Sequence, residues 1–434
     1  MNKKIRKVTA VIVLIGLFAM TTACGRGDKP APRSKITVQF CGHVNEAWNN
    51  SHRLAIAKFN ASQDEIEVVA SFFPYEDFEE KINVSLVNGG SDVDIYEMWG
   101  GWCLDYIALG VLSRAPDYLI ADLTKDCYEP VLGALKGADG NFYGIPLEYN
   151  IEYGGMLVNK PRFEEMGLEY PKTWDAIIDT AKKTTKYSGS VYTMRGLDFT
   201  TDDTLTTTFL SMILSMGAEY WVNGKFSFTT PEARQALQTL VDYVKVYRLT
   251  NLDSATEAQG AEIDGAHFLG RDEAMMVPRG PWVISMLEEE YGKTYGVDFD
   301  YIKFPFFGKI PAFPAETGWS MCVPKNSKAA EAAWKYIDFF MHHENLLRHN
   351  INCSQVPPRK SVATDSGYAE QMPFMIPLLD ILDYGRFIGP FNTDVLKRGV
   401  REIYISLCTD DGRFASAGDA LSALEDQLNT ELGF

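Results

Sequence analysis

Segment 141–160 carries polar side chains suited to hydrogen bonding within an otherwise apolar stretch. Its apolar ends predict strands at Phe142–Leu147 and Met156–Val158, and Gly154 and Gly155 allow the backbone to bend between them without a steric cost. We expect this segment to cross between two lobes and to face a ligand between them; a plain hairpin with a polar turn is the alternative. Its candidate ligand-binding side chains are two carboxylates and a phenol, Glu148, Glu152 and Tyr149.

A second group of candidates follows from the strand and helix pattern near the start of the chain. The sequence predicts strands at Ile36–Phe40, Ile66–Phe73 and Val93–Met98, with a helical pattern in each interval. This alternation is typical of a parallel sheet covered on both faces, and such sheets bind ligands beyond the carboxyl ends of their strands. The side chains that follow those ends and could contact a ligand are Asn45, Trp99 and Trp102.

Helical patterns dominate the later part of the chain. Apolar side chains recur at helical spacing after Thr173, Thr230 and Ser327, and each hydroxyl can accept a hydrogen bond from the first turn of a helix. The mainly helical block at 171–248 indicates a second lobe. Together with the parallel sheet, it predicts the α/β class.

Composition narrows the function. A chain of 434 residues suggests two domains, and 46% hydrophobic with 23% charged residues is typical of a folded globular protein. The net charge of −17 argues against nucleic acid, because no basic excess is present to neutralise phosphate. The sequence contains no CxxC, HExxH, GxSxG or P-loop motif, so we assign no catalytic residue, metal site or cofactor.

The N-terminus predicts export. Residues 1–23 combine a basic start with an apolar run, Val8–Met20, that is too short for an ordinary membrane-spanning helix. Small residues before Cys24 resemble a bacterial lipobox, which implies cleavage before this cysteine and lipid on its sulfur and new amino group. Residues 24–33 would then be a flexible tether on the extracytoplasmic side of the cell membrane. An ordinary secretory cleavage near Ala23 is the alternative.

Several stretches together resemble the maltose-binding-protein-like, sugar-binding family of extracellular solute-binding proteins of ABC importers. In chain order they are GGSDVDIYEMWGGW, GNFYGIPLEYNIEYGGMLVNK, PKTWDAI, GRDEAMMVPRGPW, KNSKAAEAAWKYIDFF and VPPRKS. The resemblance implies a two-lobed periplasmic-binding-protein fold of type II, with discontinuous lobes, a hinge and an interlobe cleft. Lobe one would comprise 34–149 and 278–319, and lobe two 150–277 and 320–434.

The resemblance also implies how a sugar is held. Carboxylates would bind sugar hydroxyls, and flat indoles would cover the C–H faces. Trp282 of the GPW motif would stack on sugar, with a core tryptophan as the alternative, and Glu152, eight residues before Lys160, would be the cleft carboxylate. Arg279 and Arg359 would either favour a uronic acid or close the lobes by pairing with glutamates. The remaining candidates are Gly318, Trp319, Arg386 and Phe391.

By this resemblance the chain would be the substrate-binding component of an ABC importer, passing a sugar or oligosaccharide to a membrane permease with its cytoplasmic ATPase. We expect a monomer. One alternative is a secreted carbohydrate-active enzyme, since paired carboxylates suit glycoside hydrolysis. Another is the same fold with a non-sugar cargo such as ferric iron, a polyamine or a peptide; Tyr149 and Tyr153 would be the iron ligands.

Overall fold

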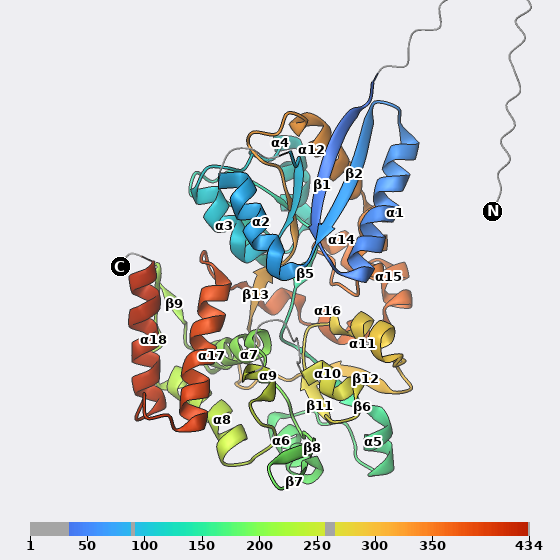
Figure 1. The fold of residues 1–434 in the computed structure, drawn as a ribbon. Coiled ribbons are helices and arrows are strands. Elements are labelled where there is room, and N and C mark those ends of the chain that lie inside the picture. The colour runs from blue at the N-terminus through green and yellow to red at the C-terminus, as the bar shows by residue number, and fades with distance from the viewer. Residues whose placement is uncertain (1–33, 88–91, 257–264, 433–434) are drawn as a thin grey trace, which may run out of the picture. The chain divides into compact units, whose positions relative to one another are not determined.

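The structure, a computed structural model, describes residues 34–87, 92–256 and 265–432. The expected signal peptide, tether and lipid-attachment residue Cys24 lie outside these residues. Lys35–Phe434 forms one compact unit. Helices and strands alternate along it, as Figure 1 shows, so the α/β class is confirmed.

The first sheet has five strands in the spatial order β2-β1-β3-β14-β4. Parallel pairing joins β1 to both β2 and β3, as the sequence predicts. β14 pairs antiparallel with both β3 and β4, and so completes the sheet. The bounds are β1 Ile36–His43, β2 Ile66–Phe73, β3 Ile95–Met98, β14 Ser320–Cys322 and β4 Ile145–Pro146. Helices packed near this sheet include α1 Glu46–Ser62, α2 Tyr75–Val87, α12 Ala330–Phe340 and α13 His343–Asn352.

The second sheet has three antiparallel strands in the order β11-β6-β12. Its strands are β11 Met276–Pro278, β6 Gly155–Asn159 and β12 Phe299–Lys303. A group of helices, in which α7 packs against α8 and α17, belongs to the later part of the chain. These helices are α6 Trp174–Thr184, α7 Asp202–Met216, α8 Pro231–Lys245, α17 Thr393–Thr409 and α18 Ala417–Glu431. Thr173 and Thr230 cap α6 and α8 as expected.

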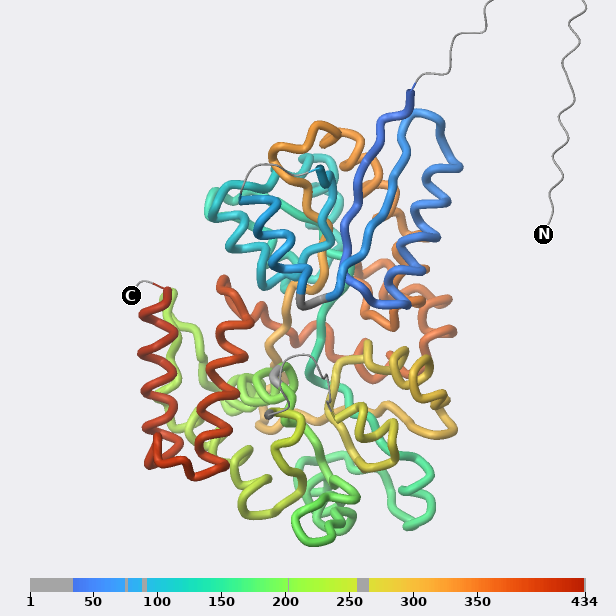
Figure 2. Tube along the Cα trace, viewed as in Figure 1, coloured from blue at the N-terminus to red at the C-terminus, as the bar shows by residue number. Residues whose placement is uncertain are grey.

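A small third sheet, which we call the connecting sheet, is built from three distant stretches of chain. Its strands are β5 Tyr149–Asn150, β13 Phe313–Thr317 and β15 Gly385–Phe387, in the order β15-β13-β5. Along the chain β5 lies between β4 of the first sheet and β6 of the second, a path that can be followed in Figure 2. Segment 141–160 therefore passes from one sheet to the other and does not turn back as a hairpin.

Strand pairing differs from the expected lobe boundaries at two segments. β12 pairs with β6, although we expected 278–319 in lobe one. β14 pairs with β3, and Tyr336 of α12 packs against Phe59 of α1, although we expected 320–434 in lobe two. The expected bounds rest on the family resemblance, and the local sequence pattern identifies a strand but not its partner. The other boundaries stay predictions.

Two local expectations also differ. The expected strand Phe142–Leu147 is regular only at β4, and α12 begins at Ala330 rather than directly after Ser327. The Ser327 hydroxyl instead donates to Asp94 and accepts from the Ala329 amide. The other elements are α3 Gly100–Ala108, α4 Asp117–Asp126, η1 Glu129–Leu135, α5 Lys160–Glu165, β7 Lys186–Ser188, β8 Val191–Met194, β9 Trp221–Val222, β10 Lys225–Phe226, α9 Asp253–Thr256, α10 Gly265–Gly270, α11 Val283–Tyr291, α14 Lys360–Ala363, α15 Ser366–Gln371, η2 Pro373–Met375, α16 Ile376–Leu379 and η3 Leu382–Tyr384.

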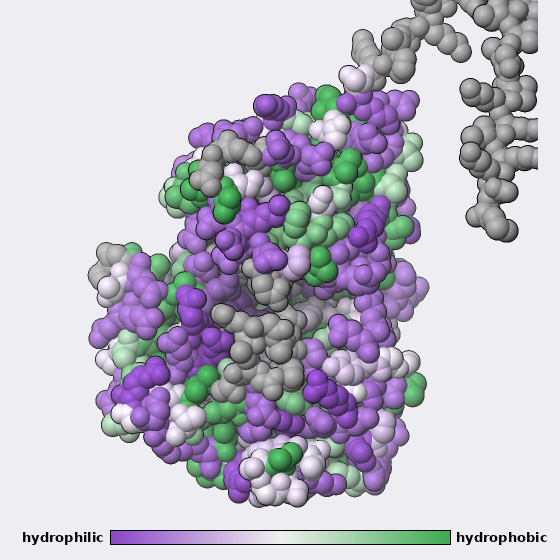
Figure 3. All heavy atoms as spheres, viewed as in Figure 1, coloured by the Kyte–Doolittle hydropathy of each residue, from purple (hydrophilic) through white to green (hydrophobic). Residues whose placement is uncertain are grey.

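One face of the molecule is predominantly polar. On the face shown in Figure 3, hydrophilic residues predominate and hydrophobic residues are scattered among them. Within the described ranges, none of the helices combines the length and the hydropathy needed to cross a bilayer.

Candidate functional site

Glu152, just after β5, is the centre of a buried group of hydrogen bonds. Its carboxylate accepts from Arg279 Nη1 at 3.0 Å, from the Gly280 amide at 3.1 Å and from Trp282 Nε1 at 2.8 Å. All three donors lie between β11 and α11, so one side chain fixes that turn. A Cβ at Gly280 would lie 2.8 Å from Glu152 Oε2, so a larger residue there would displace the carboxylate from its donors.

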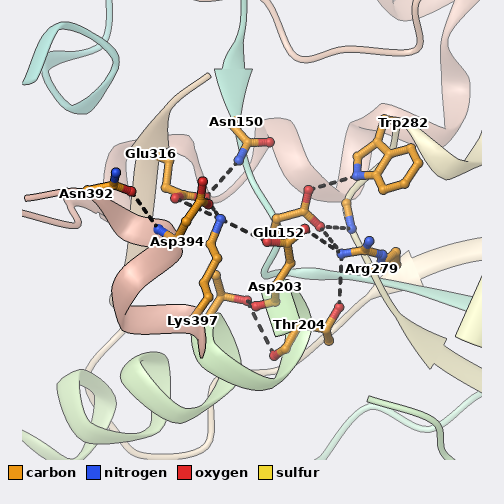
Figure 4. A network of polar contacts seen from close by, with 12 residues as sticks. Asn150, Glu152, Asp203, Thr204, Arg279, Trp282, Glu316, Asn392, Asp394 and Lys397 are labelled. Atoms are coloured by element: carbon orange, nitrogen blue, oxygen red, sulfur yellow. Dashed lines mark hydrogen bonds and ion pairs between the residues drawn. The ribbon is translucent and has the colours of Figure 1, made fainter. Parts of the chain in front are cut away.

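From Glu152, acidic and basic side chains alternate in a chain of contacts that we call the charge chain. Arg279 Nη1 also contacts Asp203 Oδ2 at 3.3 Å, in the first turn of α7. Lys397 Nζ, from α17, contacts Asp203 Oδ1 at 2.8 Å and Glu316 Oε1, in β13, at 3.1 Å. Figure 4 shows these side chains pointing toward one another from α7, α17, β13 and the segments that follow β5 and β11. Each cation lies between two carboxylates, so both positive charges are compensated, and three carboxylates face two cations.

Two neutral side chains also contact the charge chain. Asn150 Nδ2, in β5, donates to Glu316 Oε2 at 3.1 Å, and Thr204 Oγ1 accepts from Arg279 Nη1 at 3.5 Å. The connecting sheet thus supplies Asn150 and Glu316, which are paired residues of β5 and β13. This arrangement joins the connecting sheet to α7 and α17.

The electrostatics follow from burial and contact. Burial raises the pKa of Glu152 and of Glu316, and Arg279 and Lys397 respectively offset part of that rise. Burial would also raise the pKa of Asp203, but Lys397 and Arg279 together hold it well below its usual range. Burial would lower the pKa of Lys397, but Asp203 and Glu316 raise it well above its usual value. Asp203 and Lys397 are therefore both charged at neutral pH.

One indole lies beside each of the two cations of the charge chain. Arg279 Cζ is 4.8 Å from the centroid of the Trp282 ring, and Lys397 Nζ is 5.2 Å from that of Trp99. Both tryptophans are partly exposed. Trp99 is the N-cap of α3, at the carboxyl end of β3, as the sequence predicts for a ligand-facing position. Its Nε1 is buried and has no hydrogen-bond partner among the described residues.

The ring of Trp319 packs edge-on against the ring of Trp99. Their ring centroids are 5.7 Å apart, and Trp319, which is 8% exposed, stacks on His43 with centroids 4.0 Å apart. Glu97 lies beneath and contacts both His43 Nδ1 at 3.0 Å and His52 Nε2 at 3.1 Å. This layer is a buried support for the indole.

Glu148 and Gly318 belong to the same layer. Glu148 Oε1 accepts from the Trp319 amide at 2.9 Å, and burial raises the pKa of Glu148 to about 8. A Cβ at Gly318 would lie 2.2 Å from Glu148 Oε1, so a larger residue there would displace the Glu148 side chain. Both residues therefore position Trp319.

Several other candidates lie apart from the charge chain. Tyr149 is fully buried and donates to the Leu382 carbonyl at 3.2 Å. Trp102, 2% exposed, donates from Nε1 to Asp394 at 2.9 Å, and Asn45 accepts from the Trp48 amide as the N-cap of α1. The last three make other contacts: Arg359 with Asp122 and Asp126, Arg386 with Glu219, and Phe391 with Trp221 and Phe226.

A cavity of about 830 Å³ lies elsewhere, among α3, α17 and α18. Of the candidate residues only Phe391 lines it, and no member of the charge chain does. We place the candidate site at the charge chain and its two indoles, because four of the candidate residues meet there. Sequence reasoning identified Trp99, Glu152, Arg279 and Trp282 there.

Sequence reasoning missed Asp203, Glu316 and Lys397. Lys397 gave a signal, because it lies on the buried stripe of α17 with Leu396 and Val400, where an unpaired lysine is costly. Asp203 stands at the start of an apolar helix, a place that capping alone would explain.

Comparison with known proteins gives an independent result. Residues 55–374 match the family model described as bacterial extracellular solute-binding protein. A putative binding protein of Brucella abortus (strain 2308) is 23% identical over 319 residues, which are 70% of this chain and 72% of that protein. The multiple sugar-binding protein of Streptococcus mutans is 24% identical over 171 residues, 38% of this chain and 39% of that protein.

Solved structures share the fold. An ABC transporter solute-binding protein from Thermotoga lettingae bound with α-D-tagatose superposes with a TM-score of 0.75 at 20% identity, covering 92% of this chain and all of that one. Maltose-bound MalE3 of T. maritima gives 0.73 at 19% identity, covering 91% and 100%. The two-lobed fold that the sequence predicts is thereby confirmed.

Proposed function

The chain belongs to the bacterial extracellular solute-binding protein family, and from that premise we propose that it binds a sugar or oligosaccharide for an ABC importer. The observation that carries the proposal is the charge chain, which links Trp99, Glu152 and Trp282 in one continuous set of contacts. Two partly exposed indoles beside its cations suit the C–H faces of a sugar. Its carboxylates suit the hydroxyls.

The two groups of elements would act as jaws around that site. Lobe one would contain the first sheet with α1, α2, α12 and α13; lobe two would contain the second sheet with α6, α7, α8, α17 and α18. The connecting sheet supplies the strands that join them, so ligand closure would be a hinge motion there. Relatives named for sugar binding support this ligand class.

The partners follow from the family. We propose that the chain is a monomer that delivers its ligand to permease subunits with a cytoplasmic ATPase, on the extracytoplasmic side of the membrane. Lipid on Cys24 would hold it there, with residues 24–33 as the tether. The basis is the lipobox-like sequence before Cys24.

Tyr149 and Tyr153, the expected ligands of ferric iron, are not available to bind it. The phenols of Tyr149 and Tyr153 are buried and donate to the carbonyls of Leu382 and Pro305. Burial raises the pKa of both phenols far above neutral pH, which opposes the phenolate that ferric iron needs. The described ranges also hold no cluster of three potential metal-binding side chains.

Thermal shift and calorimetry on the purified full chain test the proposal. Neutral mono-, di- and trisaccharides, spermidine and ferric citrate would be compared as ligands, because a ligand that binds only the folded state raises its melting temperature. We expect at least one carbohydrate to bind one-to-one and to be recovered unchanged. Turnover of the bound carbohydrate would support the enzyme alternative. If only spermidine or ferric citrate raised the melting temperature, the proposed ligand would be a polyamine or iron and not a sugar.

A further inference from the structure

We infer that this site selects neutral carbohydrates and rejects their anionic counterparts, such as uronic acids. The inference rests on the proposed function and specifies the ligand class within it. It differs from the sequence-based hypothesis that arginines in the cleft would favour a uronic acid.

The cations at the site are already paired and shielded. Arg279 lies between Glu152 and Asp203, and Lys397 between Asp203 and Glu316. Each of the two basic side chains is only 7% exposed. A ligand carboxylate would have to displace a buried protein carboxylate to reach either one, and such displacement leaves a buried charge unpaired.

The most exposed member of the charge chain is an acid. The Asp203 side chain is 33% exposed, compared with 5% for Glu152 and 4% for Glu316. Contact with Lys397 and Arg279 keeps it ionised. An incoming ligand therefore meets a carboxylate, which accepts hydrogen bonds from hydroxyls and repels a second carboxylate.

The other candidate arginines do not supply a receptor for an anion at this site. Arg359 forms ion pairs with Asp122 and Asp126 through Nη2 and Nε. Arg386 contacts Glu219 on the surface. Both arginines are engaged with acids outside the charge chain, so neither offsets the repulsion from Asp203.

Matched sugar pairs test the inference by calorimetry on the full chain at pH 7.5. The probes are glucose with glucuronate, galactose with galacturonate, and galactobiose with digalacturonate. For any pair that binds, we expect the uronate to bind at least tenfold more weakly, and this difference to narrow between 50 and 500 mM NaCl because salt screens exposed charge. Equal or tighter uronate binding would overturn the inference and leave sugar binding intact.

Two variants locate the repulsion. Asp203→Asn removes one negative charge from the charge chain, and we expect the neutral-to-uronate difference to shrink at least threefold. Asp122→Asn makes the same substitution at a carboxylate that is 61% exposed and paired with Arg359, and should leave the difference unchanged. An unchanged difference in folded Asp203→Asn would refute the assignment; the salt series on the unmodified chain tests it if that variant does not fold. If no neutral or acidic sugar binds, the proposed function fails as well.

Discussion

Replacing Glu152 by glutamine tests the site most directly. The carboxylate is 5% exposed and accepts three hydrogen bonds, whereas glutamine keeps one acceptor oxygen and turns an amide N–H₂ toward donors. Removing one partner of a buried ion pair costs about 3–5 kcal/mol. Because Arg279 would still be paired with Asp203, we expect a loss at the lower end of this range, about 3 kcal/mol. For 434 residues the unfolding entropy is about 0.9 kcal/mol/K, so the melting temperature should fall by about 3 °C.

Glu219→Gln is the matched control. It removes the same kind of glutamate from an arginine, Arg386, but the two side chains are 56% and 46% exposed. An exposed pair contributes less than about 1 kcal/mol, so this variant should melt within about 1 °C of the unmodified chain. Scanning calorimetry at pH 7 compares the two. Equal melting temperatures for both variants would show that the contacts of Glu152 do not hold the Arg279–Trp282 turn, and the site would have to be redrawn.

The other predictions concern the indoles, the buried acid and the helix cap. Trp282→Phe removes the 2.8 Å hydrogen bond to Glu152 and should weaken carbohydrate binding at least tenfold by calorimetry, whereas Trp174→Phe, in the core of α6, should lower the melting temperature and leave affinity unchanged. The raised pKa of Glu148, about 8, means that the folded chain binds more protons than the unfolded chain between about pH 4.5 and 8, so stability falls as pH rises through that window by up to about 1.4 kcal/mol per unit; Glu148→Gln should flatten this dependence, and parallel curves of melting temperature against pH would contradict it. Asn45→Ala should cost about 1 kcal/mol of stability through the lost cap, and Asn45→Ser should retain it; a loss of affinity in folded Asn45→Ser would mark a ligand contact.

Local pattern was enough for the parallel strands and for the helices that begin after Thr173 and Thr230. Their hydrophobic spacing and capping residues act over a few neighbouring positions, which a single sequence displays. The partner of β14 depends instead on contacts between residues more than 150 positions apart. No local signal encodes that pairing, so the sequence alone could not place Ser320–Cys322 beside β3.

The site divides in the same way. Glu152 and Trp282 stand in stretches that resemble a known family, and Trp99 follows from strand topology. Lys397 and Asp203 acquire their meaning only from each other, across α17 and α7, and from Arg279. Charge pairing between remote helices could not be read from either stretch alone.

The position of β14 has a consequence for biogenesis. Ser320–Cys322, which forms β14, lies between β3 and β4 and joins them into one sheet. During synthesis, β3 and β4 cannot pair with β14 until roughly three quarters of the polypeptide has been made. Closing the long stretch of chain between these strands makes their assembly slow. Until then both edges are unprotected and open to aggregation.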